Sequence, residues 1–186
     1  MELVRAMARI VCLGEAMAEL TCQDESWRLG HGGDTLNTAI HLARAGHDVA
    51  YLTALGGDPF SQRLREGCAA EGLDTALILT DPQRTCGLYA ISTDDTGERS
   101  FTYWRDASAA RGMFALEGMA AAADVAAGAD LLAFSLISLA ILPPEGRAAL
   151  LALARRVRAR GGQVAFDGNY RARLWESPAG VSAAEA

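Results

Sequence analysis

Short apolar stretches alternate along this chain with stretches whose apolar residues recur at helical spacing, and this alternation constrains the fold more than any other feature. Residues 9–13 and 48–55 are apolar and each is followed by glycine, which is typical of β-strands. Between them, one helical face collects four apolar residues: Leu36, Ala39, Ile40 and Ala43. Asp34 or Thr35 can cap the start of this helix, and Gly46 can end it. The pattern predicts an α/β fold.

A second helix follows the second strand. Asp58 precedes Pro59, a pair that suits the N-cap and first turn of a helix, and Gly72 marks its end. The inward face of this helix is predicted to carry Phe60, Leu64 and Cys68.

The last third of the chain predicts a strand, a helix and a strand in that order. Residues 129–135 form a continuous apolar run, which is typical of a strand buried on both faces. Residues 143–160 form an amphipathic helix built on Leu150, Leu153, Ala154 and Val157. Residues 163–167 are the next parallel strand, whereas the alanine-rich segment 109–129 gives no clear pattern.

Two strand-like segments, 85–93 and 98–105, interrupt this rhythm and predict a β-hairpin. Alternation along the second arm puts Phe101, Tyr103 and Arg105 on one face. This face can be an ordinary solvated surface, since aromatic residues and arginine are common in cross-strand pairs. It can equally cover a ligand, with the Arg105 guanidinium clamping a carboxylate or phosphate beside the Tyr103 ring.

Charge and hydropathy argue against two classes of partner. The chain has 186 residues, 51% of them hydrophobic, so it can bury a sizeable core. Its formal net charge is −6 and no basic stripe is evident, so neither nucleic acid nor an anionic membrane is expected as a partner. The sequence contains no apolar run of membrane-spanning length and no secretory signal pattern, so the expected compartment is the cytoplasm.

Residue types exclude several reaction classes. All 17 basic residues are arginine, so neither a P-loop lysine nor a Schiff-base lysine is available. The four cysteines show no Cys-x-x-Cys spacing, and we expect them to be reduced and buried: Cys12, Cys22, Cys68 and Cys86. The three histidines lack the spacing of metal ligands, so no metal site built by the protein is predicted.

Two glycines, Gly32 and Gly33, open straight into the first predicted helix. Bare backbone at a helix start lets a small polar ligand approach, although such turns often serve only backbone geometry. Asn37 in the first turn strengthens the ligand hypothesis because its amide can both donate and accept hydrogen bonds, whereas Asp34 could be only an N-cap. The similar glycine pair before Asp58 is interpreted as a helix start, with Asp58 as its cap rather than a catalytic base.

A second polar cluster follows the last predicted strand. Its members are Asp167, Asn169, Arg171 and Arg173. Ligands of open α/β sheets bind outside the carboxyl ends of the strands, so this cluster is a candidate binding site.

Several longer motifs occur in one order along the chain. They are Gly14-Glu15 with Glu19, GGDTLNTAIHLARAG, YLTALGGDPFSQRL, GLYAISTDDTGERSFTYWRDASAA, SLAILPP and FDGNYRARLWES. In these motifs the chain resembles the ribokinase-like (PfkB-type) carbohydrate kinases over almost all its length, and among them those that act on 2-keto-3-deoxygluconate. The resemblance implies the N-terminal portion, residues 1–186, of a ribokinase-like three-layer α/β sandwich, with a small β lid from strands at about 16–22 and 85–105. Leu136 departs from the pattern, since this branch usually has glycine there.

The resemblance implies transfer of the γ-phosphoryl group of ATP, with Mg²⁺, to the 6-hydroxyl of 2-keto-3-deoxygluconate. The substrate-binding residues that it implies are Gly33, Asp34, Thr35, Leu36, Asn37, Tyr89, Tyr103, Arg105 and Arg171. It further implies that Asn169 and Arg171 face the phosphates of ATP. The catalytic aspartate and the ATP-binding portion of the family are expected beyond residue 186. The chain itself is therefore expected to bind substrate, to hold no catalytic residue or metal ligand, to bind ATP and Mg²⁺ weakly and to show little activity alone.

Members of this family pair through their lids, so the resemblance also implies a homodimer. Two alternatives stay open. One is a sugar kinase of the same family with another substrate, such as fructose, ribose or a different sugar acid. The other is a non-catalytic module that binds a sugar acid or dimerises.

Overall fold

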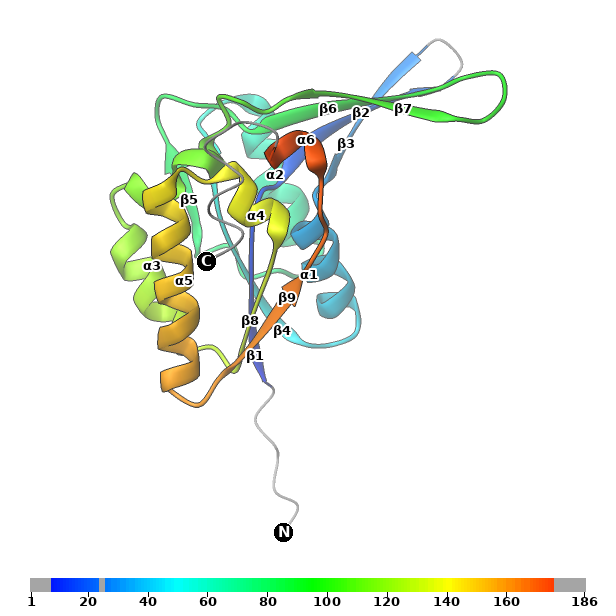
Figure 1. Ribbon diagram of the computed structural model, residues 1–186. Helices are drawn as coiled ribbons and strands as arrows, with labels where there is room; N and C mark the ends of the chain where they lie inside the picture. Colours follow the sequence, from blue (N-terminus) through cyan, green and yellow to red (C-terminus); the bar gives the residue numbers. More distant parts are fainter. Residues whose placement is uncertain (1–7, 24–25, 176–186) are drawn as a thin grey trace.

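The computed structural model describes residues 8–23 and 26–175, which form a central parallel sheet and a separate, smaller sheet (Figure 1). The central sheet has the strand order β5-β4-β1-β8-β9, and all its strand pairs are parallel. Its strands are β1 (Arg9–Leu13), β4 (Asp48–Gly56), β5 (Ile78–Asp81), β8 (Leu131–Ser135) and β9 (Gln163–Asp167). Because the strands are parallel, their carboxyl ends share one edge of the sheet.

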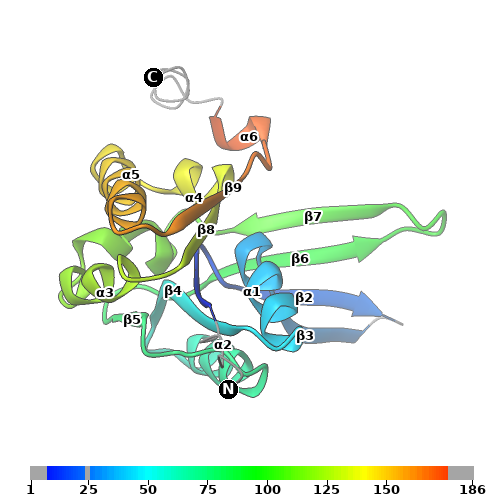
Figure 2. The same cartoon turned by 90° about the horizontal axis from the view of Figure 1, so that it is seen from below.

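Helices cover both faces of this sheet and give three layers (Figure 2). One face is packed by α1 (Asp34–Arg44) and α2 (Pro59–Ala70). The other is packed by a 3₁₀ segment, η1 (Ala109–Ala115), with α3 (Met119–Ala126), α4 (Leu136–Ile141) and α5 (Pro144–Ala159). A last short helix, α6 (Ala172–Trp175), follows β9.

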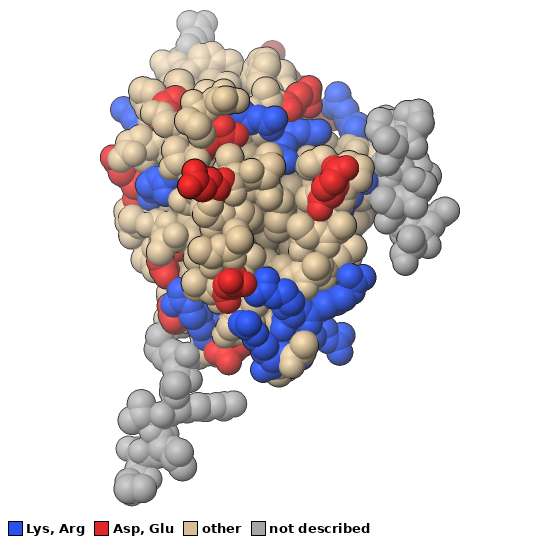
Figure 3. Space-filling view, turned by 90° about the vertical axis from the view of Figure 1, so that its left-hand side faces the viewer, with Lys and Arg blue, Asp and Glu red and all other residues tan. Residues whose placement is uncertain are grey.

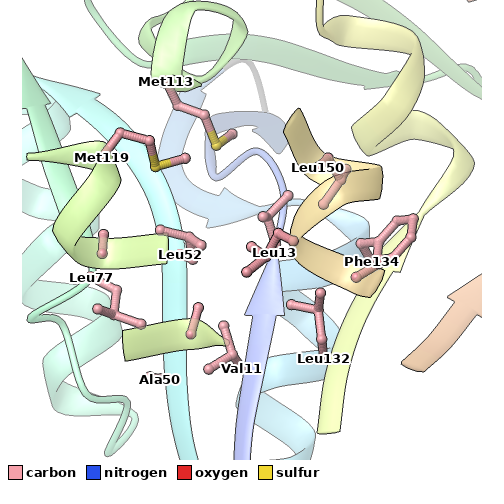
Figure 4. Packing of buried hydrophobic residues seen from close by; sticks show 14 of the residues in the cluster. Val11, Leu13, Ala50, Leu52, Leu77, Met113, Met119, Leu132, Phe134 and Leu150 are labelled. Carbon is pink, nitrogen blue, oxygen red and sulfur yellow. The ribbon is translucent and has the colours of Figure 1, made fainter. Parts of the chain in front are cut away.

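Alternate residues of β1 feed the two cores on either side of the sheet. Val11 and Leu13 join the cluster that α5 covers, whereas Cys12 joins the cluster that α1 covers. Figure 4 shows Met113 and Leu150 packing over the first of these clusters. A central strand buried on both faces explains why this segment is apolar throughout.

The smaller sheet, here called the lid, projects from the body of the molecule (Figure 1). It has the order β3-β2-β6-β7, from β2 (Met17–Gln23), β3 (Ser26–Gly32), β6 (Gly87–Thr93) and β7 (Arg99–Trp104). β6 and β7 form the predicted hairpin, and β2 pairs with β6 in parallel. The structure thus confirms the predicted α/β fold of three layers with a β lid.

Two expectations about helices were wrong. Neither Asp34 nor Thr35 caps α1: its N-cap is Gly33, and no side chain bonds to the free amides there. Phe60 does not face inward but is 52% exposed, because it lies in the first turn of α2, where Asp58 caps the amides of Phe60 and Ser61.

Two expectations about burial hold only in part. All four cysteines are free thiols, but Cys22 on the lid is half-buried. In β8, Leu132 and Phe134 are buried beneath α5, whereas Leu131 and Ala133 on the opposite face are only half-buried. Leu136 stands at the first position of α4, directly after its N-cap Ser135, where a helical backbone does not require glycine.

Arginine side chains are less evenly spread than the sequence suggests. On the face that Figure 3 shows, basic side chains gather toward the lower end, to which α5 runs in Figure 1. The last turn of α5 carries Arg156 and Arg158. Positive charge at the C-terminus of a helix stabilises the helix through its interaction with the helix dipole. No helix in the described part of the chain is long and apolar enough to cross a bilayer.

Candidate functional site

A cavity of about 240 Å³ lies between the lid and the carboxyl ends of the central strands. Most of the predicted site residues line it: Gly33, Asp34, Asn37, Tyr89, Tyr103, Arg105, Asn169 and Arg171. They come from α1, the lid hairpin and the segment after β9, which are remote in sequence. Four residues outside the predicted set complete the lining: Glu15, Met17, Phe101 and Ile137.

The two glycines at the start of α1 are required for different reasons. Gly33 has φ 141°, and a Cβ there would lie 2.3 Å from the carbonyl oxygen of Glu15. A Cβ on Gly32 would lie 2.2 Å from the Tyr89 hydroxyl oxygen. The loop can therefore approach Glu15, which follows β1, only with glycine at position 33, whereas a side chain at position 32 would displace the Tyr89 hydroxyl.

The first turn of α1 divides its side chains between the cavity and the core. Asn37 is exposed and lines the cavity, and the Asp34 carboxylate accepts a hydrogen bond of 3.2 Å from the Asn169 amide. Leu36 and Thr35 are buried instead, with the Thr35 hydroxyl 3.0 Å from the hydroxyl of Tyr51. The structure does not bring the side chains of these two predicted residues into the cavity.

Arg105 is committed to an internal ion pair. Its guanidinium donates to the carboxylate of Glu15, and both side chains are nearly buried. Burial raises the pKa of Glu15, while the positive charge of Arg105 and the nearby Ser108 hydroxyl act in the opposite direction. Arg105 also lies 5.9 Å from the centre of the Tyr103 ring.

Aromatic rings form the lid wall of the cavity. The rings of Tyr89 and Tyr103 stack with centres 5.8 Å apart, and Phe101 stacks on Tyr103 at 6.3 Å. The Tyr89 hydroxyl donates to the carboxylate of Glu19, and burial together with this carboxylate raises the pKa of Tyr89. Tyr89 is therefore a neutral hydrogen-bonding group at neutral pH.

The polar cluster after β9 is only partly brought to this cavity. Asn169 and Arg171 line it, and the exposed Arg171 donates to the backbone carbonyl of Tyr170. Arg173 lines an adjoining cavity of about 460 Å³, which shares Tyr103, Arg105 and Arg171 with the first. Asp167 lines a hollow on the α1 side of β8 and β9 and does not reach the first cavity.

Glu15 is the functional candidate that residue patterns alone did not single out. It follows β1 at the edge where ligands bind, and that position was the available signal. Its partner Arg105 lies 90 residues away, so no local pattern reveals the pair. Phe101 was predicted to share a face with Tyr103 and Arg105, and it does line the cavity with them.

Comparison with known sequences gives one family. Residues 7–185 match the family described as "pfkB family carbohydrate kinase". The chain is 47% identical over 173 residues to the 2-dehydro-3-deoxygluconokinase of Escherichia coli (strain K12), covering 91% of this chain and 56% of that protein. It is 44% identical over 172 residues to the protein of the same name from Dickeya dadantii (strain 3937), with coverages of 90% and 56%. The chain thus spans about half the length of the curated relatives it matches.

Solved structures give the same fold. A PfkB protein from Polaromonas sp. JS666 superimposes with a TM-score of 0.82 at 28% identity, over 96% of this chain and 61% of that one. The 2-dehydro-3-deoxygluconokinase of Thermotoga maritima superimposes with a TM-score of 0.79 at 24% identity, over 90% and 53%, and this likeness concerns the fold alone.

Proposed function

The chain belongs to the pfkB family of carbohydrate kinases, and we propose that its protein phosphorylates the 6-hydroxyl of 2-dehydro-3-deoxygluconate, also called 2-keto-3-deoxygluconate. Support for the substrate class comes from relatives that carry this activity in their names at 44% and 47% identity. The cavity between lid and sheet is the proposed site of substrate binding.

The observation that carries the proposal is the set of donors in this one cavity. Two arginines, Arg105 and Arg171, lie with the amides of Asn37 and Asn169 against a wall of aromatic rings. Guanidinium groups bind a carboxylate, amides bind hydroxyls, and ring faces pack against the carbon chain of a sugar. A sugar acid uses all three kinds of contact, whereas fructose or ribose uses only two.

Within the cavity, Arg171 is best suited to form an ion pair with the substrate carboxylate. Arg105 is already paired with Glu15, whereas the described contacts of Arg171 include only a backbone carbonyl. Asn37 and Asp34 at the start of α1 suit the hydroxyls of the chain. The aromatic lid wall excludes water, which protects the transferred group from hydrolysis.

ATP and Mg²⁺ complete the proposed reaction: when bound, they supply the phosphoryl group and the positive charge that stabilises its transfer. The donor types that the segment after β9 brings to the cavity fit a phosphate chain, since Asn169 offers an amide and Arg171 a guanidinium. Among the described residues, no three His, Cys, Asp or Glu side chains gather as a metal site. Mg²⁺ bound to nucleotides keeps phosphate and water ligands, so it does not need such a cage.

The carboxylates that line the cavity serve binding rather than proton transfer. Glu15 is paired with Arg105, and Asp34 accepts a hydrogen bond from Asn169. In the part of the chain that the structure describes, no other carboxylate lines this cavity. We therefore assign the described residues to substrate binding.

We further propose that the protein is a cytoplasmic homodimer that pairs through the lid. All four cysteines are free thiols, which suits a reducing compartment. One lid face exposes Phe101 and Tyr103 by almost half of their surface, and such exposed aromatic area favours association.

The test is ATP-dependent phosphorylation by the intact protein, measured for 2-keto-3-deoxygluconate, fructose, ribose and gluconate. We expect the highest kcat/KM with 2-keto-3-deoxygluconate. Arg171→Ala should raise its KM by about tenfold or more, since a hydrogen bond to a charged group contributes about 1.5–3 kcal/mol. Arg99→Ala removes an exposed lid arginine outside the cavity and should leave KM unchanged.

Two results would contradict the proposal. A higher kcat/KM with fructose or ribose would assign the site to a neutral sugar. Binding of the sugar acid in calorimetry without turnover and without ATP binding would identify a non-catalytic binding module.

A further inference from the structure

The ion pair between Glu15 and Arg105 ties the body of the molecule to the lid. Glu15 lies between β1 of the central sheet and β2 of the lid, and Arg105 directly follows β7. The pair therefore lies at the base of the lid, where the chain enters and leaves it. If the lid moves relative to the central sheet, Arg105 and the part of the cavity wall that it forms move with it.

The surroundings of Glu15 leave its carboxylate little freedom. The residue is 3% exposed, and a Cβ added to Gly87 would lie 2.7 Å from one carboxylate oxygen. A Cβ on Gly33 would meet the Glu15 backbone carbonyl. Glycines on the lid and at the start of α1 thus leave room for Glu15 on two sides.

A purely structural role explains this pair poorly. Buried ion pairs often contribute no more stability than well-packed apolar residues would. One carboxylate oxygen of Glu15 and Nε of Arg105 are buried, and each lacks a hydrogen-bond partner among the described residues. Arg105 nevertheless lines both adjoining cavities, so the pair sets the direction of a guanidinium in the wall of the proposed binding site.

We propose that Glu15 is a positioning residue for sugar-acid binding: it holds the Arg105 guanidinium in the cavity wall, so that Arg105 meets the substrate in one orientation. This inference rests on the proposed function of the cavity. Glu15 acts through Arg105 and needs no contact with the substrate. A fixed donor loses less conformational entropy on binding than a free arginine side chain does.

Two variants separate position from charge. Glu15→Ala removes the acceptor of Arg105. Gly87→Ala keeps every charge but forces the Glu15 carboxylate to shift, because its new Cβ would lie 2.7 Å from it. Glu98→Gln, which neutralises an exposed glutamate in the lid hairpin, is the matched control.

In the intact protein, we expect Glu15→Ala to raise KM for 2-keto-3-deoxygluconate about tenfold or more and Gly87→Ala about threefold or more. KM for ATP should stay within about twofold in both variants, since the pair orients a group for the sugar acid. Glu98→Gln should change neither value. Unchanged KM for the sugar acid in both variants, or an equal rise of KM for ATP, would overturn the proposal.

A second readout does not depend on turnover. The side-chain Nε–H resonance of Arg105, assigned by its loss in Arg105→Lys, should report a rigid, solvent-protected group in the wild type. Its order parameter should fall in Glu15→Ala and Gly87→Ala but not in Glu98→Gln. An unchanged order parameter would overturn the proposal even if KM changes. A wild-type protein that does not accept the sugar acid would contradict the proposed function alone, and this readout would still decide whether Glu15 fixes Arg105.

Discussion

At the scale of single residues, the site depends on where side chains are missing as much as on where they are present. The loop before α1 approaches the Glu15 backbone at Gly33, where only glycine fits, and the Tyr89 hydroxyl at Gly32, where a side chain would displace that hydroxyl. This close contact brings Asn37 and Asp34 to the cavity. The glycines therefore shape the candidate site through backbone position.

Gly33→Ala should lower the free energy of unfolding by more than the strain of positive φ alone. Gly46→Ala is the matched control, because Gly46 has φ 89° but open space around its Cβ position. We expect Gly46→Ala to cost about 1–2 kcal/mol, the price of a left-handed residue. Gly33→Ala adds a clash with backbone and should cost about 1–3 kcal/mol more. Urea unfolding of both variants tests this, and equal losses would contradict it.

Sequence alone could predict the chemistry of these residues but only part of their arrangement. Asn37, Asn169 and Arg171 were predictable because each follows a marked structural boundary, a helix start or a strand end. The pairing of Arg105 with Glu15 was not, because it depends on how the lid folds back over the end of β1. Thr35 and Leu36 show the opposite case, since positions within a binding motif can still face the core.

At the scale of elements, the local sequence pattern was sufficient to predict a strand wherever the residues that end the strand are themselves marked in the sequence. β1 and β9 begin and end at the predicted residues, because their apolar runs stop at glycine or at a polar cluster. β3 was not predicted, since its sequence SWRLGHG combines two glycines with charged and polar residues. It forms as an edge strand because β2 offers it a complete antiparallel ladder. The stabilisation of β3 therefore depends on its neighbour β2, and the sequence of β3 alone does not predict it.

The start of α2 is an element whose stability should depend on pH. Burial opposes the charged form of Asp58, but hydrogen bonds from the Ser61 side chain and from the amides of Ser61 and Phe60 outweigh it, so the pKa of Asp58 falls below 3.8. A lowered pKa in the folded state means that the stabilisation is complete above the unfolded value and is lost as pH falls through the folded one.

Asp58→Ala should therefore cost about 1 kcal/mol at pH 7, the usual contribution of an N-cap. The difference from wild type should narrow as the pH falls below 3.8, when the Asp58 carboxylate becomes protonated in both states. Urea unfolding between pH 7 and pH 3 measures this difference. Asp95→Ala, which removes an exposed carboxylate from the hairpin turn, should match wild type throughout. A difference that stays constant with pH would show that the Asp58 charge contributes nothing.

At the scale of the whole molecule, large apolar side chains are exposed at the edge of the central sheet and on both faces of the lid. At the edge of the central sheet, Phe166 of β9 is 52% exposed and lies beside Phe134, its partner in register, on the face that α5 covers. On the lid, Phe101 and Tyr103 are exposed on one face, and Trp27 and Trp104 are exposed on the other. Parallel sheets are normally covered on both faces, whereas a sheet with antiparallel strand pairs, such as the outer pairs of the lid, can remain open on one face, so we expect two copies to pair through the lid.

If two copies pair through the lid face that carries Phe101, a charge on that face should separate them. Ile91 lies on this face between Thr21 and Phe101, and its neighbour Ser92 points to the opposite face of the same strand. Ile91→Arg should therefore give a monomer, because a dimer would have to bury an unpaired guanidinium. Ser92→Arg makes the same addition on the other face and should remain dimeric. Sedimentation equilibrium of the intact protein measures the oligomeric state of both variants. If Ile91→Arg remains a dimer and Ser92→Arg becomes a monomer, the interface lies instead on the lid face that carries Trp27 and Trp104.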